Sequence, residues 1–189
     1  MGRSKESTRL HDFFLSMARR SFTELGLRNE AVVGYVAALM TEFARADRLY
    51  ALRTENRSAI DSVVRILLES SSTARSQYGL SRAREVRKYV GDYALFMSGL
   101  FRAYVERKGT LDYYLAEGRR SYWAVSELDL SLYRTGFLFF QELSKNFEYY
   151  SGALDYMRKA YFTPEPGRSP FETFLKQVEG WITSGISDN

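Results

Sequence analysis

The sequence predicts an all-α protein, and three observations indicate this class. Apolar residues recur at spacings of three and four, with no sustained apolar–polar alternation. All three prolines fall in one segment, FTPEPGRSP. The 189 residues, 45% of them hydrophobic, suit one domain with a sizeable core. We therefore expect residues 1–189 to form a single compact domain of six to eight helices, in a bundle-like or orthogonal array.

The N-terminal part predicts a helix over about residues 8–25. Ser7 or Thr8 can cap its start, and Gly26 suits the left-handed residue after its end. Its apolar stripe consists of Leu10, Phe13, Phe14, Met17, Ala18 and Phe22.

Three further helices are expected before residue 102. The second begins near Asn29 and extends as far as 52. The third covers about 58–70, where consecutive serines weaken the pattern. The next follows Ser81 and continues to about 101.

The region after Gly109 and Thr110, a stop followed by a new cap, predicts two more helical segments. The first ends in a short connection at about 129–131. A long helical segment then covers about 132–162, and Gly136 or Gly152 can bend it.

FTPEPGRSP is the clearest loop in the chain, and it precedes a strong helix start. Ser169, Pro170 and Glu172 form a capping box with proline at the first helical position. The predicted helix covers about 170–182, and its apolar face comprises Phe171, Phe174, Leu175, Val178 and Trp181. Such a short helix cannot bury that face alone, so we expect it to dock on the rest of the domain after a loop at 163–170.

A phrase occurs twice, as VGYVAALMTEF at 33–43 and VGDYALFMSGLF at 90–101. On a helix, its small residues share one face, which lets another backbone approach closely. We therefore predict close packing at Gly34 and Gly91, either of the two helices together or against a shared neighbour. Asp92, where the two copies differ, is the better candidate for function.

Composition excludes several chemistries. Without Cys, the chain has no disulfides, thiol nucleophiles or cysteine metal sites, and His11 alone cannot build a histidine zinc or di-iron site. No Walker A, GxGxxG or GxSxG motif occurs. We expect no cofactor, no metal and no assigned catalytic residue, although acid–base chemistry by Tyr, Asp and Arg stays open. No signal peptide and no membrane span are expected, so we place the chain in the cytoplasm.

Basic residues concentrate in the first part of the chain. Residues 1–108 contain 19 Lys and Arg against 12 Asp and Glu, whereas residues 109–189 contain 8 against 11. Candidate nucleic-acid or anion-binding residues are Arg84, Arg87, Lys88, Arg119 and Arg120. The alternative is a solvated surface in which acids match these charges locally.

Tyrosines beside acids suggest a pocket or an interface. The candidates are Asp92, Tyr93, Tyr113, Tyr114, Tyr149 and Tyr150. A tyrosine has an apolar ring and a polar tip, which suits a small-molecule or lipid site, a protein partner, or simply the edge of a core.

The segment from Lys88 to Ser126 carries a resemblance. KYVGDYALFMSGLF followed by GTLDYYLAEGRRSYWAVSEL is similar to a family of uncharacterised bacterial proteins with a Gly-Asp-x-x-Leu-Phe-x-Ser-Gly-x-Phe phrase and then a Tyr-Tyr phrase. The resemblance covers about a fifth of the chain and implies no activity.

By elimination, we expect a non-enzymatic, cytosolic helical protein that acts in interaction or regulation, with another protein or a second copy as its partner. The alternatives are nucleic-acid or ribosome association through the basic half, and small-molecule or lipid binding in a Tyr-lined cavity.

Overall fold

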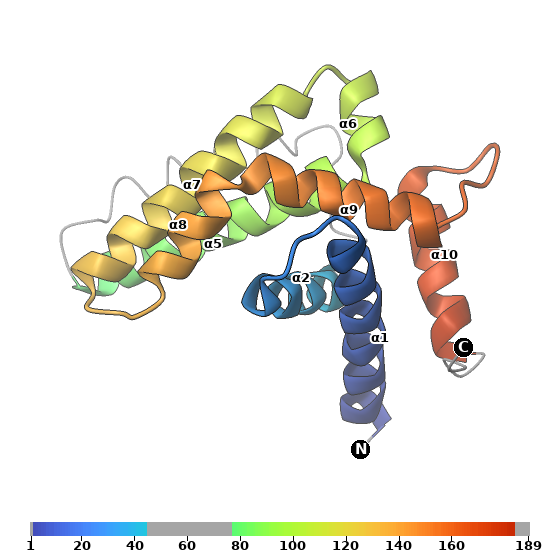
Figure 1. Ribbon diagram of the computed structural model, residues 1–189, viewed down its shortest axis with the longest axis horizontal. Coiled ribbons are helices and arrows are strands. Elements are labelled where there is room, and N and C mark those ends of the chain that lie inside the picture. The colour runs from blue at the N-terminus through green and yellow to red at the C-terminus, as the bar shows by residue number, and fades with distance from the viewer. Residues whose placement is uncertain (1, 45–76, 184–189) are drawn as a thin grey trace. The chain divides into compact units, whose positions relative to one another are not determined.

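The structure, a computed structural model, describes residues 2–44 and 77–183. All regular elements in these ranges are helices, which confirms the all-α class (Figure 1). The helices are α1 (Gly2–Glu24), α2 (Glu30–Phe43), α5 (Gln77–Leu100), α6 (Arg102–Arg107), α7 (Leu111–Ser131), α8 (Phe137–Lys145), α9 (Phe147–Tyr161) and α10 (Pro170–Thr183). The helix predicted at 58–70 lies outside the described residues.

The chain forms two compact units. Unit 1 contains Met1–Thr54 and Ala153–Asn189, and unit 2 contains Glu55–Gly152. The division falls inside α9. The single-domain organisation stays a prediction.

Gly26 and Asn29 form the turn between α1 and α2. Gly26 has a φ of 75°, and the Leu27 N–H donates to the Phe22 carbonyl at 2.8 Å, so α1 ends in a left-handed glycine motif. The Asn29 side chain accepts the Val32 N–H at 3.3 Å and caps α2. The left-handed residue predicted at Gly26 and the helix start predicted near Asn29 are confirmed.

The predicted N-terminal cap of α1 is wrong. Ser7 and Thr8 lie inside the helix, which begins at Gly2. Arg3, Lys5 and Glu6 are good helix formers, so the helix extends past hydroxyl residues that could have capped it.

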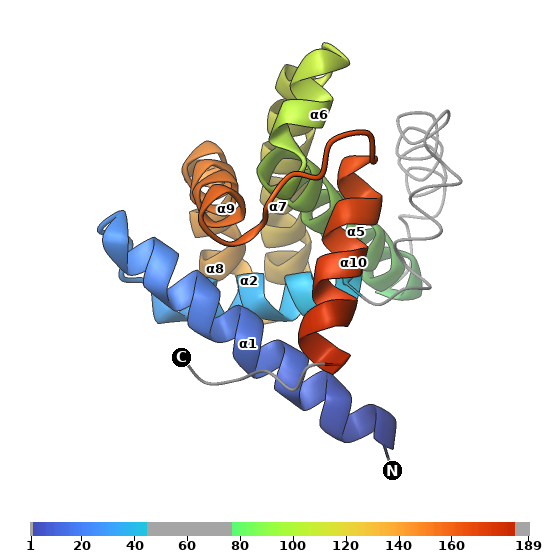
Figure 2. The ribbon, with the colours of Figure 1, turned by 90° about the vertical axis from the view of Figure 1, so that its right-hand side faces the viewer.

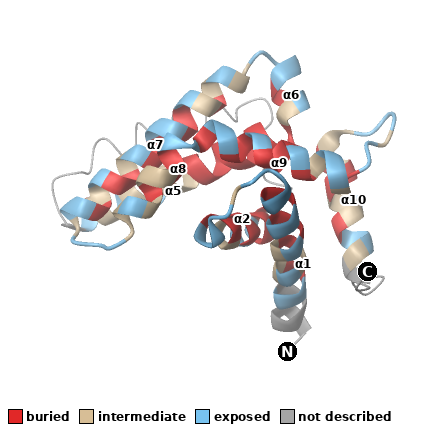
Figure 3. Cartoon of the chain, viewed as in Figure 1, coloured by how far each residue is buried: buried red, intermediate tan, exposed pale blue. Residues whose placement is uncertain are grey.

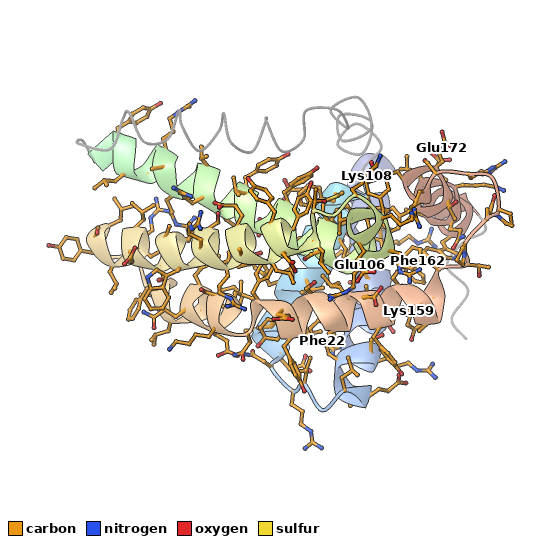
Figure 4. The ribbon with its side chains drawn as sticks, turned by 90° about the horizontal axis from the view of Figure 1, so that it is seen from above. Phe22, Glu106, Lys108, Lys159, Phe162 and Glu172 are labelled. Carbon is orange, nitrogen blue, oxygen red and sulfur yellow. The ribbon has the colours of Figure 1, made fainter. Side chains whose placement is uncertain are left out.

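Aromatic side chains hold α10 within unit 1. The Phe162 ring lies 5.0 Å from both the Phe174 ring and the Trp181 ring, and the Phe13 ring of α1 lies 4.7 Å from Trp181. Figure 2 shows α10 reaching α1, and Figure 4 labels Phe162 at the end of α9, next to α10. Ser169 Oγ accepts the Glu172 N–H at 3.2 Å, which confirms the predicted N-cap.

Unit 2 is built on α5 and α7, which pack antiparallel (Figure 1). Two predicted boundaries in this unit are wrong. The α7 helix continues to Ser131, so no connection lies at 129–131, and Asp129 is a buried helical residue. The long segment predicted at 132–162 is two helices, because α8 ends at Lys145 and α9 begins after Asn146. The Asn146 backbone N–H donates to the Glu142 carbonyl at 3.1 Å, and its side chain donates to Glu142 Oε1 at 3.0 Å.

The two glycines of the repeated phrase have different surroundings. A Cβ on Gly91 would lie 2.6 Å from the Tyr122 ring, whereas a Cβ on Gly34 would meet nothing within 4 Å. The close-packing hypothesis therefore holds for Gly91, whose neighbour is α7, and it is wrong for Gly34. Another small residue of the second phrase, Ser98, accepts a hydrogen bond from Ser151 Oγ of α9 at 2.9 Å.

Alanine substitutions at Gly34 and Gly91 should therefore have opposite effects. Gly91→Ala should lower the free energy of unfolding by about 1–3 kcal/mol, because the new methyl group overpacks against Tyr122. Gly34→Ala should raise it by up to about 1 kcal/mol through helix propensity alone. Urea titrations of both variants test this, and equal destabilisation by both would contradict it.

Tyr133 ends α7 in an unusual conformation. Its φ is 55°, and the Arg134 N–H donates to the Asp129 carbonyl at 2.8 Å, so Tyr133 occupies the position where glycine is usual. Its side chain is 97% exposed, so packing does not offset the strain.

We expect Tyr133→Gly to raise the free energy of unfolding by about 1 kcal/mol, because glycine adopts this conformation without strain. Tyr133→Ala is the control, since it removes the ring but keeps the strain. If the alanine variant gains as much stability as the glycine variant in thermal unfolding, the backbone explanation fails.

Candidate functional site

Among the described residues of unit 2, three carboxylates are buried, and each is paired with a basic residue of α5. Asp92, Glu117 and Asp129 have exposed fractions of 6%, 4% and 0%. A buried carboxylate is tolerated only where opposite charge and hydrogen bonds compensate for lost water. The bases that supply this compensation are three of the predicted anion-binding residues, Arg84, Arg87 and Lys88.

The Arg84–Asp129 pair is the most deeply buried of these contacts. Arg84 Nε donates to Asp129 Oδ1 at 2.5 Å, and Arg84 Nη2 donates to Asp129 Oδ2 at 3.3 Å, so the ion pair is bidentate. The guanidinium also bonds Glu85 at 2.8 Å and lies 5.4 Å from the centre of the Phe140 ring. Burial lowers the pKa of Arg84, but the hydrogen bonds to Asp129 and Glu85 outweigh burial and leave that pKa above its ordinary value.

Asp92 connects α5 to α7. Lys88 Nζ donates to its Oδ2 at 2.6 Å, and the Tyr122 hydroxyl donates to its Oδ1 at 2.8 Å. Tyr122 is fully buried, and its ring fills the space that Gly91 leaves open. Asp92 therefore binds the hydroxyl of Tyr122, and the absence of a side chain at Gly91 leaves room for the ring of the same tyrosine.

Glu117 is shared between two arginines. Arg87 Nη1 donates to Oε1 at 3.3 Å, and Arg120 Nη1 donates to Oε2 at 2.8 Å. Ser121 Oγ also donates to Oε1 at 3.3 Å. The Arg120 side chain is 70% exposed, so it covers this carboxylate from the solvent side.

Three of the predicted tyrosines come together beside this network. The Tyr114 ring lies 6.0 Å from both the Tyr93 and the Tyr113 rings, and Tyr89 stacks 6.5 Å from Tyr93. Burial raises the pKa of both Tyr114 and Tyr113. The negative charge of Glu117 raises the pKa of Tyr113 further, and the positive charge of Arg120 lowers it by less than these two effects raise it. These phenols stay protonated at neutral pH, which makes them hydrogen-bond donors rather than bases.

The other two predicted tyrosines lie on α9. The Tyr150 hydroxyl donates to Glu142 Oε1 of α8 at 2.6 Å, and burial together with this bond raises the pKa of Tyr150. Tyr149 is 63% exposed.

The arrangement leaves little free charge for an external anion. Arg84, Arg87 and Lys88 face three buried carboxylates one for one, which is the local matching that the alternative interpretation expected. A phosphate at these three residues would have to displace a buried carboxylate from its cation. Nucleic-acid binding at these residues stays an untested prediction.

Sequence reasoning missed the outward face of α7. We use this name for five exposed residues, Ala116, Arg119, Trp123, Glu127 and Leu130. At 100° per residue they fall within an arc of about 80°, opposite the buried side of the helix (Figure 3). The signal in the sequence was the seven-residue spacing of Trp123 and Leu130, which are 41% and 49% exposed.

The charges on this face are only loosely paired. Arg119 lies 3.7 Å from Glu148, and both side chains are more than half exposed, at 53% and 64%. The Glu127 side chain has no ion pair among the described residues.

Other kinds of site find no support in the described parts of the chain. No three His, Cys, Asp or Glu side chains there are grouped to hold a metal ion. None of the described helices is long and apolar enough to cross a membrane. No protein-family model, no curated protein and no solved structure matches the chain.

Removing one partner of the Arg84–Asp129 pair should be strongly destabilising. Asp129→Ala removes the buried partner of the Arg84 guanidinium, leaves it only the exposed Glu85, and should lower the free energy of unfolding by about 3–5 kcal/mol. Replacing both partners, as in Arg84→Met with Asp129→Leu, should recover much of this loss.

The matched control is Arg19→Ala in unit 1, which breaks the exposed Arg19–Glu30 pair and should lower stability by less than about 1 kcal/mol. Denaturant unfolding of all four proteins, wild type included, measures these differences. If Asp129→Ala is no worse than Arg19→Ala, the buried pair does not stabilise unit 2.

Proposed function

We propose that this protein is a non-enzymatic interaction protein that binds a protein partner through the outward face of α7. The observation that carries the proposal is the exposure of Trp123 and Leu130 on one face of a helix whose opposite face is buried. Tryptophan is enriched at the centre of protein interfaces, and charged residues are usual at their rim. Arg119 and Glu127 are charged residues of this kind, set on either side of Trp123.

The polar groups of unit 2 support binding rather than acid–base catalysis. A general base must reach a substrate proton and have a free acceptor site. Asp92, Glu117 and Asp129 are buried, and each accepts hydrogen bonds from a cation of the same chain. A cytoplasmic location belongs to this proposal because a chain without Cys suits a reducing compartment.

The geometry gives less support to the two alternative functions, nucleic-acid or ribosome association and small-molecule or lipid binding. Three of the cations proposed to meet nucleic acid, Arg84, Arg87 and Lys88, are paired with buried carboxylates. The support for a tyrosine-lined cavity is limited to the packing of the Tyr93 and Tyr113 rings against the Tyr114 ring. Both stay predictions from the sequence.

The test is affinity capture from the native host with four baits. The wild type and Leu138→Arg should capture the same partner, because Leu138 is 63% exposed but belongs to α8. Trp123→Arg and Leu130→Arg should each reduce its recovery at least roughly tenfold, the loss expected when an interface hot spot is removed. Thermal unfolding verifies that every bait is folded.

Two results would refute the proposal. One is that no protein is captured differently by the baits altered on α7. The other is that Leu138→Arg loses the partner as completely as Trp123→Arg.

A further inference from the structure

We propose that the outward face of α7 binds a second copy of this chain, antiparallel, about a two-fold axis that passes beside Trp123. This inference rests on the proposed function and names the partner for the same surface. Its support is the order of residues along the face, which is complementary to itself.

An antiparallel pair of identical helices brings together positions that are equally far from the axis. With the axis at Trp123, that residue meets its own copy. Arg119 and Glu127 each lie four positions from Trp123, so Arg119 of one copy faces Glu127 of the other. Ala116 and Leu130 each lie seven positions from Trp123, so Ala116 of one copy faces Leu130 of the other. The two off-axis pairings each occur twice, and the Trp123 pair on the axis occurs once, as a two-fold interface requires.

These pairings are favourable in charge and in size. Arg119 meets an acid that has no ion pair among the described side chains, and its own pair with Glu148 is long and exposed. A small alanine opposite each leucine leaves room for the larger side chain, and the two indoles meet at the centre. A parallel pair in register would instead place Arg119 against Arg119 and Glu127 against Glu127, so charge selects the antiparallel arrangement.

The expected dimer is weak. The α7 helix has 21 residues and is therefore about 31 Å long. One helix pair of this length lies at the small end of specific interfaces, where association is transient and depends on concentration. The prediction is a monomer–dimer equilibrium rather than an obligate dimer.

The test uses charge reversal, read out by sedimentation of the purified full chain over a roughly hundredfold range of concentration. Wild type should shift from monomer to dimer. Arg119→Glu and Glu127→Arg should each weaken self-association at least roughly tenfold, because each places like charges opposite one another twice.

Mixing these two variants in equal amounts should restore dimers. In the mixed pair, the two acids of one chain face the two arginines of the other. The double variant Arg119→Glu with Glu127→Arg should also dimerise, since it exchanges the charges within each chain. Neither rescue is expected if the substitutions merely unfold the protein.

A cross-link tests the position of the axis. Because the chain has no Cys, a single introduced thiol reports only its own contact. Under mild oxidation, Trp123→Cys should form a disulfide-linked dimer, whereas Leu138→Cys, exposed on α8, should not.

The inference is overturned if wild type stays monomeric over the whole range, or if dimers form but the mixed charge variants show no rescue. Either result leaves the proposed function standing if a captured partner still depends on Trp123 and Leu130. Loss of both the dimer and any such partner would reject the proposed function as well.

Discussion

The ion pair between Arg84 and Asp129 is the constraint on which unit 2 depends. Asp129 is fully buried, and a carboxylate in that position is stable only beside a compensating cation. The pair also fixes the register of α5 against α7. Gly91 lies seven residues after Arg84 on α5, and Tyr122 lies seven residues before Asp129 on α7. The Tyr122 ring occupies the space beside Gly91. The same register lets the Tyr122 hydroxyl reach Asp92.

This register determines which residues remain for function. The cations of α5 that suggested an anion-binding surface are directed at buried carboxylates, so these three positive charges are neutralised within unit 2. With its inner face occupied in this way, α7 presents Trp123 and Leu130 to solvent. Packing on one side of the helix therefore defines the proposed binding surface on the other.

Features set by local chemistry could be predicted from the sequence, and features set by distant residues could not. Gly26, Asn29 and Ser169 act on backbone groups within a few residues, so their spacing was sufficient. Asp129 resembled a turn residue because aspartate favours turns, but it lies buried inside a helix and pairs with an arginine 45 positions away. Gly34 and Gly91 occupy equivalent places in a repeated phrase, yet only Gly91 faces a tyrosine. The outward face of α7 was visible as a spacing, but its exposure depends on what covers the other side.

The most direct test of this account is the side-chain NMR signal of Arg84. If Asp129 holds the guanidinium, its Nε–H should give a resolved resonance that exchanges slowly with water, assigned by its loss in Arg84→Lys. That resonance should keep its position when inorganic phosphate or RNA is added. Rapid exchange with solvent, or a shift on adding phosphate, would contradict the account by showing that Arg84 is available to an external anion.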